Sequence, residues 1–141
     1  MSTSCIYGFK KNEKLKLMFN ISDSYPSGFG KDIVLFIREN TLEQLNEICD
    51  NITLKDRKDF PNDREINEMK EKNIYYEHNE KILNWDDIFW INDTFLNYYK
   101  NDFYVIPDYQ EWLDGLHDYL YIINLDNNNL GTVFYSVYIQ K

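Results

Sequence analysis

The sequence is poor in cysteine, glycine, proline and histidine, with two, five, three and two residues respectively among 141. Cys5 and Cys49 lie far apart, so they give neither a disulfide framework nor the close spacing of a metal site. Residues 1–20 hold no long apolar run behind basic residues, and no stretch of the chain is apolar enough to span a bilayer. We therefore expect a cytoplasmic protein in a reducing compartment, without a signal peptide or membrane contact.

Basic residues are scarce as well. Fifteen Lys and Arg side chains stand against 24 Asp and Glu, which gives a formal net charge of −9 and a pI near 4.6. Such a charge repels nucleic-acid phosphates, because a general grip on DNA or RNA needs clustered lysine and arginine. We expect no direct nucleic-acid binding. The acidic charge suits a basic protein partner, and the alternative is that it serves solubility alone.

Apolar and aromatic residues are abundant. Hydrophobic residues make up 43% of the chain and aromatic residues 17%, with 12 tyrosines, nine phenylalanines and three tryptophans. This composition excludes a disordered chain. A length of 141 residues suffices for one domain with a real core, and we expect a single domain over residues 1–141.

Hydrophobic periodicity predicts strands at both ends of the chain and helices between them. Residues 5–9 and 15–19 alternate around a polar turn, and residues 119–125 and 130–139 do so around a turn at 126–129, so each pair predicts a β-hairpin. Helices are predicted over 30–39, from Thr41 with Gln44 in a capping box, briefly after Pro61, over 85–99, and from Pro107 with Trp112, Leu113 and Leu116. The predicted fold class is α+β, an antiparallel sheet from the N- and C-terminal hairpins packed against several helices.

One stretch, residues 20–30, turns the second predicted strand into the first predicted helix. Asp23 and Ser24 can bond to nearby backbone N–H groups, and Gly28 and Gly30 allow backbone angles that other residues avoid. This elbow, which also carries Tyr25, is either a structural turn or a place where the N–H groups of a helix start receive an anion.

A second candidate site is formed by Asp114, His117 and Asp118. On a helix these positions are i, i+3 and i+4, which places the three side chains on one face. Such a face could orient a histidine general base or hold zinc with an open position. The competing interpretation is a surface histidine with acidic neighbours, and we assign no catalytic residue, metal or cofactor.

Three stretches together resemble a family of small, largely uncharacterised proteins of bacteria and their phages. They are Tyr-Gly-Phe at 7–9, Asn20 with Asp-Ser-Tyr-Pro-Ser-Gly-Phe-Gly at 23–30, and Trp-Leu-Asp-Gly-Leu at 112–116 followed by Tyr-Ile-Ile-Asn-Leu-Asp at 121–126. In that family's pattern a histidine follows the asparagine and a leucine stands between the two glycines. Ile21 and Phe29 occupy these positions here, so any chemistry of that histidine is lost. The resemblance implies a shared fold and a phage or bacterial setting.

These observations lead to one main functional prediction and two alternatives. The first is a non-enzymatic phage or mobile-element protein that binds and inhibits a basic, nucleic-acid-handling defence protein, as anti-CRISPR proteins do. An alternative is a small hydrolase or small-ligand-binding protein using the elbow and the Asp114, His117 and Asp118 face. The last is a structural protein that forms a homo-oligomer, and the oligomeric state is left open. The predicted partner-binding residues are Asp59, Asp63, Glu65, Glu68, Tyr75, Tyr76, Asp86 and Asp87.

Overall fold

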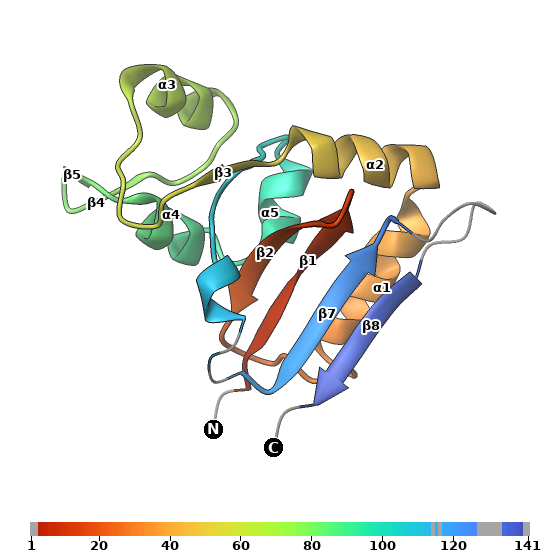
Figure 1. Ribbon diagram of the computed structural model, residues 1–141. Coiled ribbons are helices and arrows are strands. Elements are labelled where there is room, and N and C mark those ends of the chain that lie inside the picture. Colours follow the sequence, from red (N-terminus) through yellow and green to blue (C-terminus); the bar gives the residue numbers. More distant parts are fainter. Residues whose placement is uncertain (1–2, 114, 116, 127–133, 140–141) are drawn as a thin grey trace. The chain divides into compact units, whose positions relative to one another are not determined.

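The computed structural model describes residues 3–113, 115, 117–126 and 134–139, the last range as backbone only (Figure 1). The chain forms two compact units, which are described separately here. The sheet unit comprises residues 1–51 and 109–141, and the central unit comprises residues 52–108. The expectation of a single domain over residues 1–141 stays a prediction.

The sheet unit contains four strands: β1 (Cys5–Lys11), β2 (Lys14–Asn20), β7 (Tyr119–Asn124) and β8 (Phe134–Ile139). β1 pairs with β2 and β7 with β8, both antiparallel, so the strand pairing of the two predicted hairpins and the α+β class are confirmed, while residues 127–133 of the second hairpin lie outside the described residues. The strand order is β2-β1-β7-β8.

The sheet is mixed, so the prediction of an antiparallel sheet is wrong at its centre. β1 and β7 run parallel, in a register that joins Cys5 to Tyr119 and Lys10 to Asn124. The physical reason is burial. Residues 5–9 of β1 and 121–123 of β7 are buried on both faces, and strands of that kind occupy the middle of a sheet, where each hairpin places its first strand.

Each face of this sheet has its own apolar cover. Helix α1 (Phe29–Glu39) packs along one face (Figure 1). There the ring of Phe29 meets that of Tyr7 edge to face, with 4.8 Å between the ring centroids. On the opposite face Ile6, Leu17 and Ile122 form a cluster, against which lie the partly buried side chains of Leu15, Phe19, Trp112, Leu113 and Leu120. The sheet is thus enclosed by packing contacts on both sides.

Helix α2 (Leu42–Asn51) follows α1 and begins at the predicted capping box. The Thr41 hydroxyl accepts a hydrogen bond from the Gln44 N–H at 3.1 Å, and the Gln44 side chain accepts one from the Thr41 N–H at 2.7 Å. This reciprocal pair satisfies two N–H groups that a helix start leaves without partners. Leu45, Ile48 and Cys49 form its buried side.

The central unit is built from short elements around an aromatic core. Its helices are α3 (Asp63–Glu71), α4 (Trp85–Ile91) and α5 (Phe95–Lys100), and its strands pair as β3 (Thr53–Lys55) with β6 (Val105–Pro107) and as β4 (Glu77–His78) with β5 (Lys81–Ile82). Tyr98 lies between Phe89 and Phe103, with ring centroids 5.3 and 5.1 Å away. Edge-to-face rings of this kind fill a small core efficiently.

Two predicted helices differ from those observed. The helix predicted over 85–99 is broken into α4 and α5, because the Asn92 side chain bonds to the Ile88 carbonyl and Asp93 adopts a left-handed φ of 79°. The helix predicted from Pro107 is wrong. Residues 105–107 form β6, which pairs with β3, and the described residues that follow contain the 3-10 turn η1 (Gln110–Trp112), while Leu116 lies outside them.

Candidate functional site

The elbow at residues 20–30 is held by hydrogen bonds to and from the buried Ser24. The Asn20 amide donates to the Ser24 hydroxyl at 2.9 Å, and that hydroxyl donates to the Asn20 carbonyl at 3.3 Å. The same amide donates to the Ser22 carbonyl at 2.7 Å. These buried hydrogen bonds stabilise the turn between β2 and α1.

The N–H groups at the start of α1 donate within the elbow. The N–H groups of Gly28 and Gly30 donate to the Tyr25 carbonyl at 2.9 and 3.1 Å, and the Phe29 N–H donates to the Asp23 carbonyl at 2.8 Å. These are the groups that an anion at the helix start would use. Their engagement favours the interpretation of the elbow as a structural turn.

The two elbow glycines are needed because neighbouring atoms leave no room for a side chain. The expectation from the sequence is instead that they adopt backbone angles that other residues avoid. A Cβ atom on Gly28 would lie 2.6 Å from the Asp23 carbonyl oxygen, and one on Gly30 would lie 2.9 Å from the Tyr121 hydroxyl. The left-handed backbone belongs instead to Asp23, at φ 52°. The glycines therefore let the chain and the Tyr121 ring approach closely.

The two ends of the sheet unit meet beside the elbow, as the ligand-binding alternative requires. The Ser24 N–H donates to the Thr3 hydroxyl at 2.8 Å, and the Ser4 N–H donates to the Asp118 carboxylate at 3.0 Å. The half-exposed ring of Tyr25 lies 6.1 Å from that of Tyr119. Asp118 thus anchors the N-terminal segment to the start of β7. The ligand-binding alternative itself stays a prediction.

His117 is buried and lies outside any helix, so the predicted helical face at 114, 117 and 118 is wrong. Turn η1 ends at Trp112 and β7 begins at Tyr119, and Asp114 lies outside the described residues. One ring nitrogen of His117 lies 2.8 Å from the Leu113 carbonyl and the other 3.1 Å from the Tyr119 carbonyl. A neutral imidazole donates to one of these carbonyls, and an imidazolium donates to both.

The interpretation of His117 as a surface histidine is also wrong, since its side chain is only 5% exposed. Among the residues that the structure describes, no three His, Cys, Asp or Glu side chains gather as a metal site would require.

Both cysteines are buried and free of disulfides. Burial raises the pKa of Cys5 to about 12, against smaller opposing effects of hydrogen bonds to Ser24 and Asn20. Burial is also the main cause of a raised pKa for Cys49, and the charge of nearby Lys16 opposes it. Since the thiolate is the nucleophilic form, both cysteines are suited to packing.

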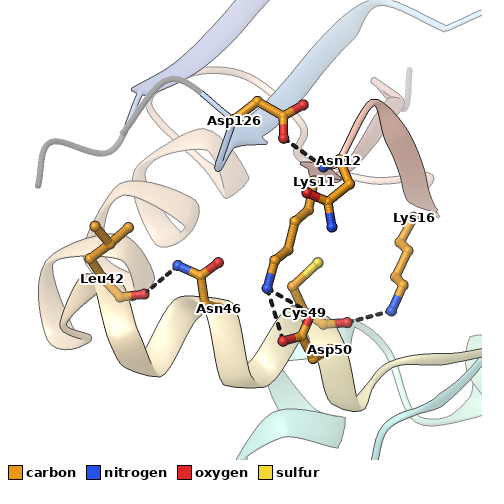
Figure 2. Close-up of polar contacts among 8 residues, drawn as sticks. All are labelled: Lys11, Asn12, Lys16, Leu42, Asn46, Cys49, Asp50 and Asp126. Atoms are coloured by element: carbon orange, nitrogen blue, oxygen red, sulfur yellow. Dashed lines mark hydrogen bonds and ion pairs between the residues drawn. The ribbon is translucent and has the colours of Figure 1, made fainter. Parts of the chain in front are cut away.

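The tip of the first hairpin carries a network of charged contacts in the sheet unit (Figure 2). The Asp126 carboxylate accepts the N–H groups of Asn12 and Glu13 at 2.5 and 3.0 Å. Lys11 pairs with Asp50 at 2.8 Å, and the Lys16 ammonium donates to the Cys49 carbonyl at 2.5 Å (Figure 2). A cation at the end of α2 complements the negative end of the helix dipole. The network fastens the hairpin tip to α2 and to the end of β7.

The predicted partner-binding residues all lie in the central unit, but their side chains differ in exposure. Asp59, Asp63, Tyr75 and Asp87 are exposed, whereas Glu65, Glu68, Tyr76 and Asp86 are partly buried. The Glu65 side chain accepts a hydrogen bond from the N–H of Asn62, the N-cap of α3, and so completes a capping box. Glu65 also forms an ion pair with Lys55 at 3.1 Å. Glu68 pairs with Lys72 at 2.8 Å.

No family model matches the chain, and neither a curated protein nor a solved structure matches it. The resemblance to small phage and bacterial proteins therefore stays a prediction.

The structure adds four exposed apolar side chains that the sequence pattern does not single out, all in the central unit: Phe60, Ile82, Trp90 and Ile91. Of these four, Trp90 could have been found from the sequence. It follows Asp86 by four positions, the spacing at which side chains of a helix contact each other. Within the described residues, no helix has both the length and the apolar character needed to cross a bilayer.

Proposed function

We propose that this protein is a non-enzymatic acidic binding protein that acts in the cytoplasm by covering a basic surface of a nucleic-acid-handling protein. The observation that carries this proposal is the distribution of exposed apolar groups. Eight large apolar side chains are exposed among the described residues, and five of them lie in the central unit: Phe60, Tyr75, Ile82, Trp90 and Ile91. Exposed large apolar side chains, aromatic ones among them, that are concentrated in one part of a protein are typical of protein-binding surfaces.

These side chains lie on or close to α4. Trp90 and Ile91 belong to it, and Ile82 ends the strand just before its N-cap, Asn84. Phe60 lies next to Asp59 in the sequence. The N–H of Trp85, the first residue of α4, donates a hydrogen bond to the Asp59 carbonyl at 2.9 Å. We call this set, with Tyr75, the aromatic surface.

Acidic residues surround the aromatic surface in the sequence. Residues 52–108 hold 13 Asp and Glu against eight Lys and Arg, and residues 73–99 hold five against Lys81 alone. Charge of this sign attracts a basic partner and speeds the encounter, while apolar contacts hold the complex. A protein that itself binds nucleic acid offers such a basic surface.

The specific form of the proposal is inhibition of a defence nuclease, such as a CRISPR effector, by occupying the surface on which it binds nucleic acid. The phage-like sequence resemblance supports this setting. The mechanism needs no cofactor and no contact of this protein with nucleic acid.

A test starts with capture from nuclease-treated host lysate at low and high salt, followed by purification of the captured protein. We expect one basic nucleic-acid enzyme whose activity falls when this protein is added. Reversing three exposed charges of the central unit, Asp59, Asp63 and Asp87, to lysine should weaken binding at least tenfold at low salt. The matched control reverses Glu39, Glu43 and Glu47 on α1 and α2 of the sheet unit. Equal losses in both triple variants would show that only net charge matters, and undiminished enzyme activity would refute inhibition.

A further inference from the structure

Two of the exposed aromatic residues in the central unit are held by hydrogen bonds. The Trp90 indole N–H donates to Oδ1 of Asp86 at 3.1 Å, one helical turn earlier on α4. Trp90 is nevertheless 40% exposed. The bond fixes the indole against a carboxylate while much of the side chain remains in contact with solvent.

Tyr75 is held at its backbone by Asn92, the C-cap of α4. The Tyr75 N–H donates to Oδ1 of Asn92 at 2.9 Å, and the Asn92 amide donates to the Tyr75 carbonyl at 2.8 Å and to the Ile88 carbonyl at 2.7 Å. Asn92 is buried, whereas Tyr75 is 69% exposed. Asn92 therefore anchors Tyr75 at the same end of α4 that carries Trp90 and Ile91.

This anchoring lowers the cost of binding. A side chain that is ordered only in a complex loses rotamer freedom when it binds. Trp90 and the backbone of Tyr75 have already lost part of that freedom in the free protein. Fixed, exposed aromatic groups are the kind of residue that dominates the energy of protein interfaces.

The carboxylates on α4 indicate what Trp90 binds. Asp86 holds Trp90, and Asp87 is the next residue along α4, with its side chain exposed. A planar guanidinium can stack on an indole face and pair with a neighbouring carboxylate at the same time. A lysine ammonium makes a point contact and lacks the planar stacking surface.

We propose that α4, with Tyr75, is an arginine-binding surface, on which an arginine of a basic protein stacks against Trp90 and pairs with Asp86 or Asp87. This inference rests on the proposed function and specifies which residues recognise the partner and which cation they prefer. It places the main contact on Trp90 and Tyr75, away from α3.

The experiment is a nuclear magnetic resonance titration of the full chain, labelled with ¹⁵N, using three short peptides of equal length. One peptide alternates glycine with arginine, one glycine with lysine, and one glycine with uncharged citrulline. We expect the indole N–H signal of Trp90 and the amide signals of Tyr75 and Asp87 to shift with the arginine peptide. The lysine peptide should bind about fivefold more weakly, and the citrulline peptide should leave the spectrum unchanged.

Variants identify the residues responsible. W90A should weaken arginine-peptide binding about fivefold. D86N keeps an acceptor for the indole but removes the charge, and it should weaken binding severalfold without moving the other signals of the fold. L35A removes an exposed apolar side chain of the sheet unit and serves as the matched control, with unchanged binding expected.

The outcomes separate this inference from the proposed function. Shifts confined to α3 and Asp59, or equal affinity for arginine and lysine peptides, would overturn the arginine-binding surface and leave an acidic binding protein. If neither cationic peptide shifts any signal at low salt, the electrostatic basis of the proposed function fails together with the inference.

Discussion

The hydroxyl of Tyr121 donates a hydrogen bond to the carbonyl oxygen of Ser24, 2.7 Å away, and so joins the central strand β7 to the elbow. The same side chain lies against Gly30, where a Cβ atom would lie 2.9 Å from the Tyr121 hydroxyl and 3.1 Å from the nearest ring carbons. Tyr98 in the central unit provides a contrast, because its hydroxyl is fully buried and has no hydrogen-bond partner. The hydroxyl of Tyr121 therefore forms a hydrogen bond, whereas that of Tyr98 is buried without one.

Replacing these two tyrosines with phenylalanine should have opposite effects on stability. Y121F removes a buried hydrogen bond and should lower the free energy of unfolding by about 1 kcal/mol. Y98F removes an unsatisfied buried hydroxyl and should raise the free energy of unfolding by up to about 1 kcal/mol. Denaturant unfolding of both variants tests this, and an equal loss of stability in the two would contradict it.

The stability of the protein should fall in alkaline solution through Cys5. Burial raises the pKa of its thiol from about 9 to about 12, so between these values the folded chain keeps a proton that the unfolded chain has released. The stabilising contribution is complete below pH 9 and is lost as pH rises, by up to about 1.4 kcal/mol per pH unit. Burial also raises the pKa of Tyr98, which extends the effect to higher pH.

The check is unfolding by denaturant at pH 8, 9 and 10 for the parent chain and for C5A. The variant should start less stable but lose stability less steeply with pH. Parallel pH profiles for the two proteins would show that Cys5 does not cause the alkaline loss.

Two charged groups that hold the tip of the first hairpin, Asp126 and Lys11, should differ in importance although both make close contacts, at 2.5 and 3.0 Å for Asp126 and at 2.8 Å for Lys11. D126A removes the acceptor of two backbone N–H groups and should cost about 2 kcal/mol. K11M breaks an ion pair whose Asp50 side chain is 61% exposed, and solvent screening should limit its cost to about 0.5 kcal/mol. Thermal unfolding of both variants compares them directly. If K11M proves the more damaging change, the order of these two contacts is reversed.

The elbow should tolerate a change at Ser27 but not at Gly28. G28A places a methyl group 2.6 Å from the Asp23 carbonyl oxygen, and the backbone must shift, at a cost of about 2 kcal/mol. Ser27 is exposed, so S27A should change stability by less than about 0.5 kcal/mol. Equal stability of the two variants in denaturant unfolding would show that the elbow adapts freely.

The central unit should be removable without loss of the sheet unit. Strands β3 and β6 pair in parallel from Thr53 with Val105 to Lys55 with Pro107, so the entry and exit of this unit lie at opposite ends of the pair, roughly 14 Å apart, which a short linker can span. A short glycine and serine linker in place of residues 52–108 should leave a folded sheet unit that does not bind the partner. Dispersed amide signals in a nuclear magnetic resonance spectrum would support this, and a collapsed spectrum would show that the two units depend on each other.

Local patterns in the sequence predict those elements that depend on local contacts. The hairpins follow from alternation, α1 from its spacing of apolar residues, and the start of α2 from Thr41 and Gln44. The break between α4 and α5 is not predicted in this way, because the Asn92 side chain bonds not only to Ile88 but also to Tyr75, 17 positions earlier, and periodicity does not indicate that second contact. The parallel pairing of β1 with β7 is likewise a contact between distant segments, which periodicity does not specify.

The same distinction between local and long-range contacts applies to the candidate site. Sequence composition indicates an acidic, aromatic surface and places Tyr75, Asp86 and Asp87 in it. The exposure of Trp90 depends on which face of α4 meets the core, where Trp85, Ile88 and Phe89 are buried. The burial of His117 depends on carbonyl groups at Leu113 and Tyr119 that only the folded chain brings to its two ring nitrogens.

The parallel pairing of β1 with β7 has a consequence for the order of events during synthesis. The central unit is continuous in sequence, so its aromatic core can form once residue 108 has left the ribosome. Strand β1 is made first but gains its neighbour β7 only after residues 119–124 have been translated. Until then the apolar edge of the first hairpin has no partner strand, and this interval is when the nascent chain is most exposed to aggregation and most in need of a chaperone.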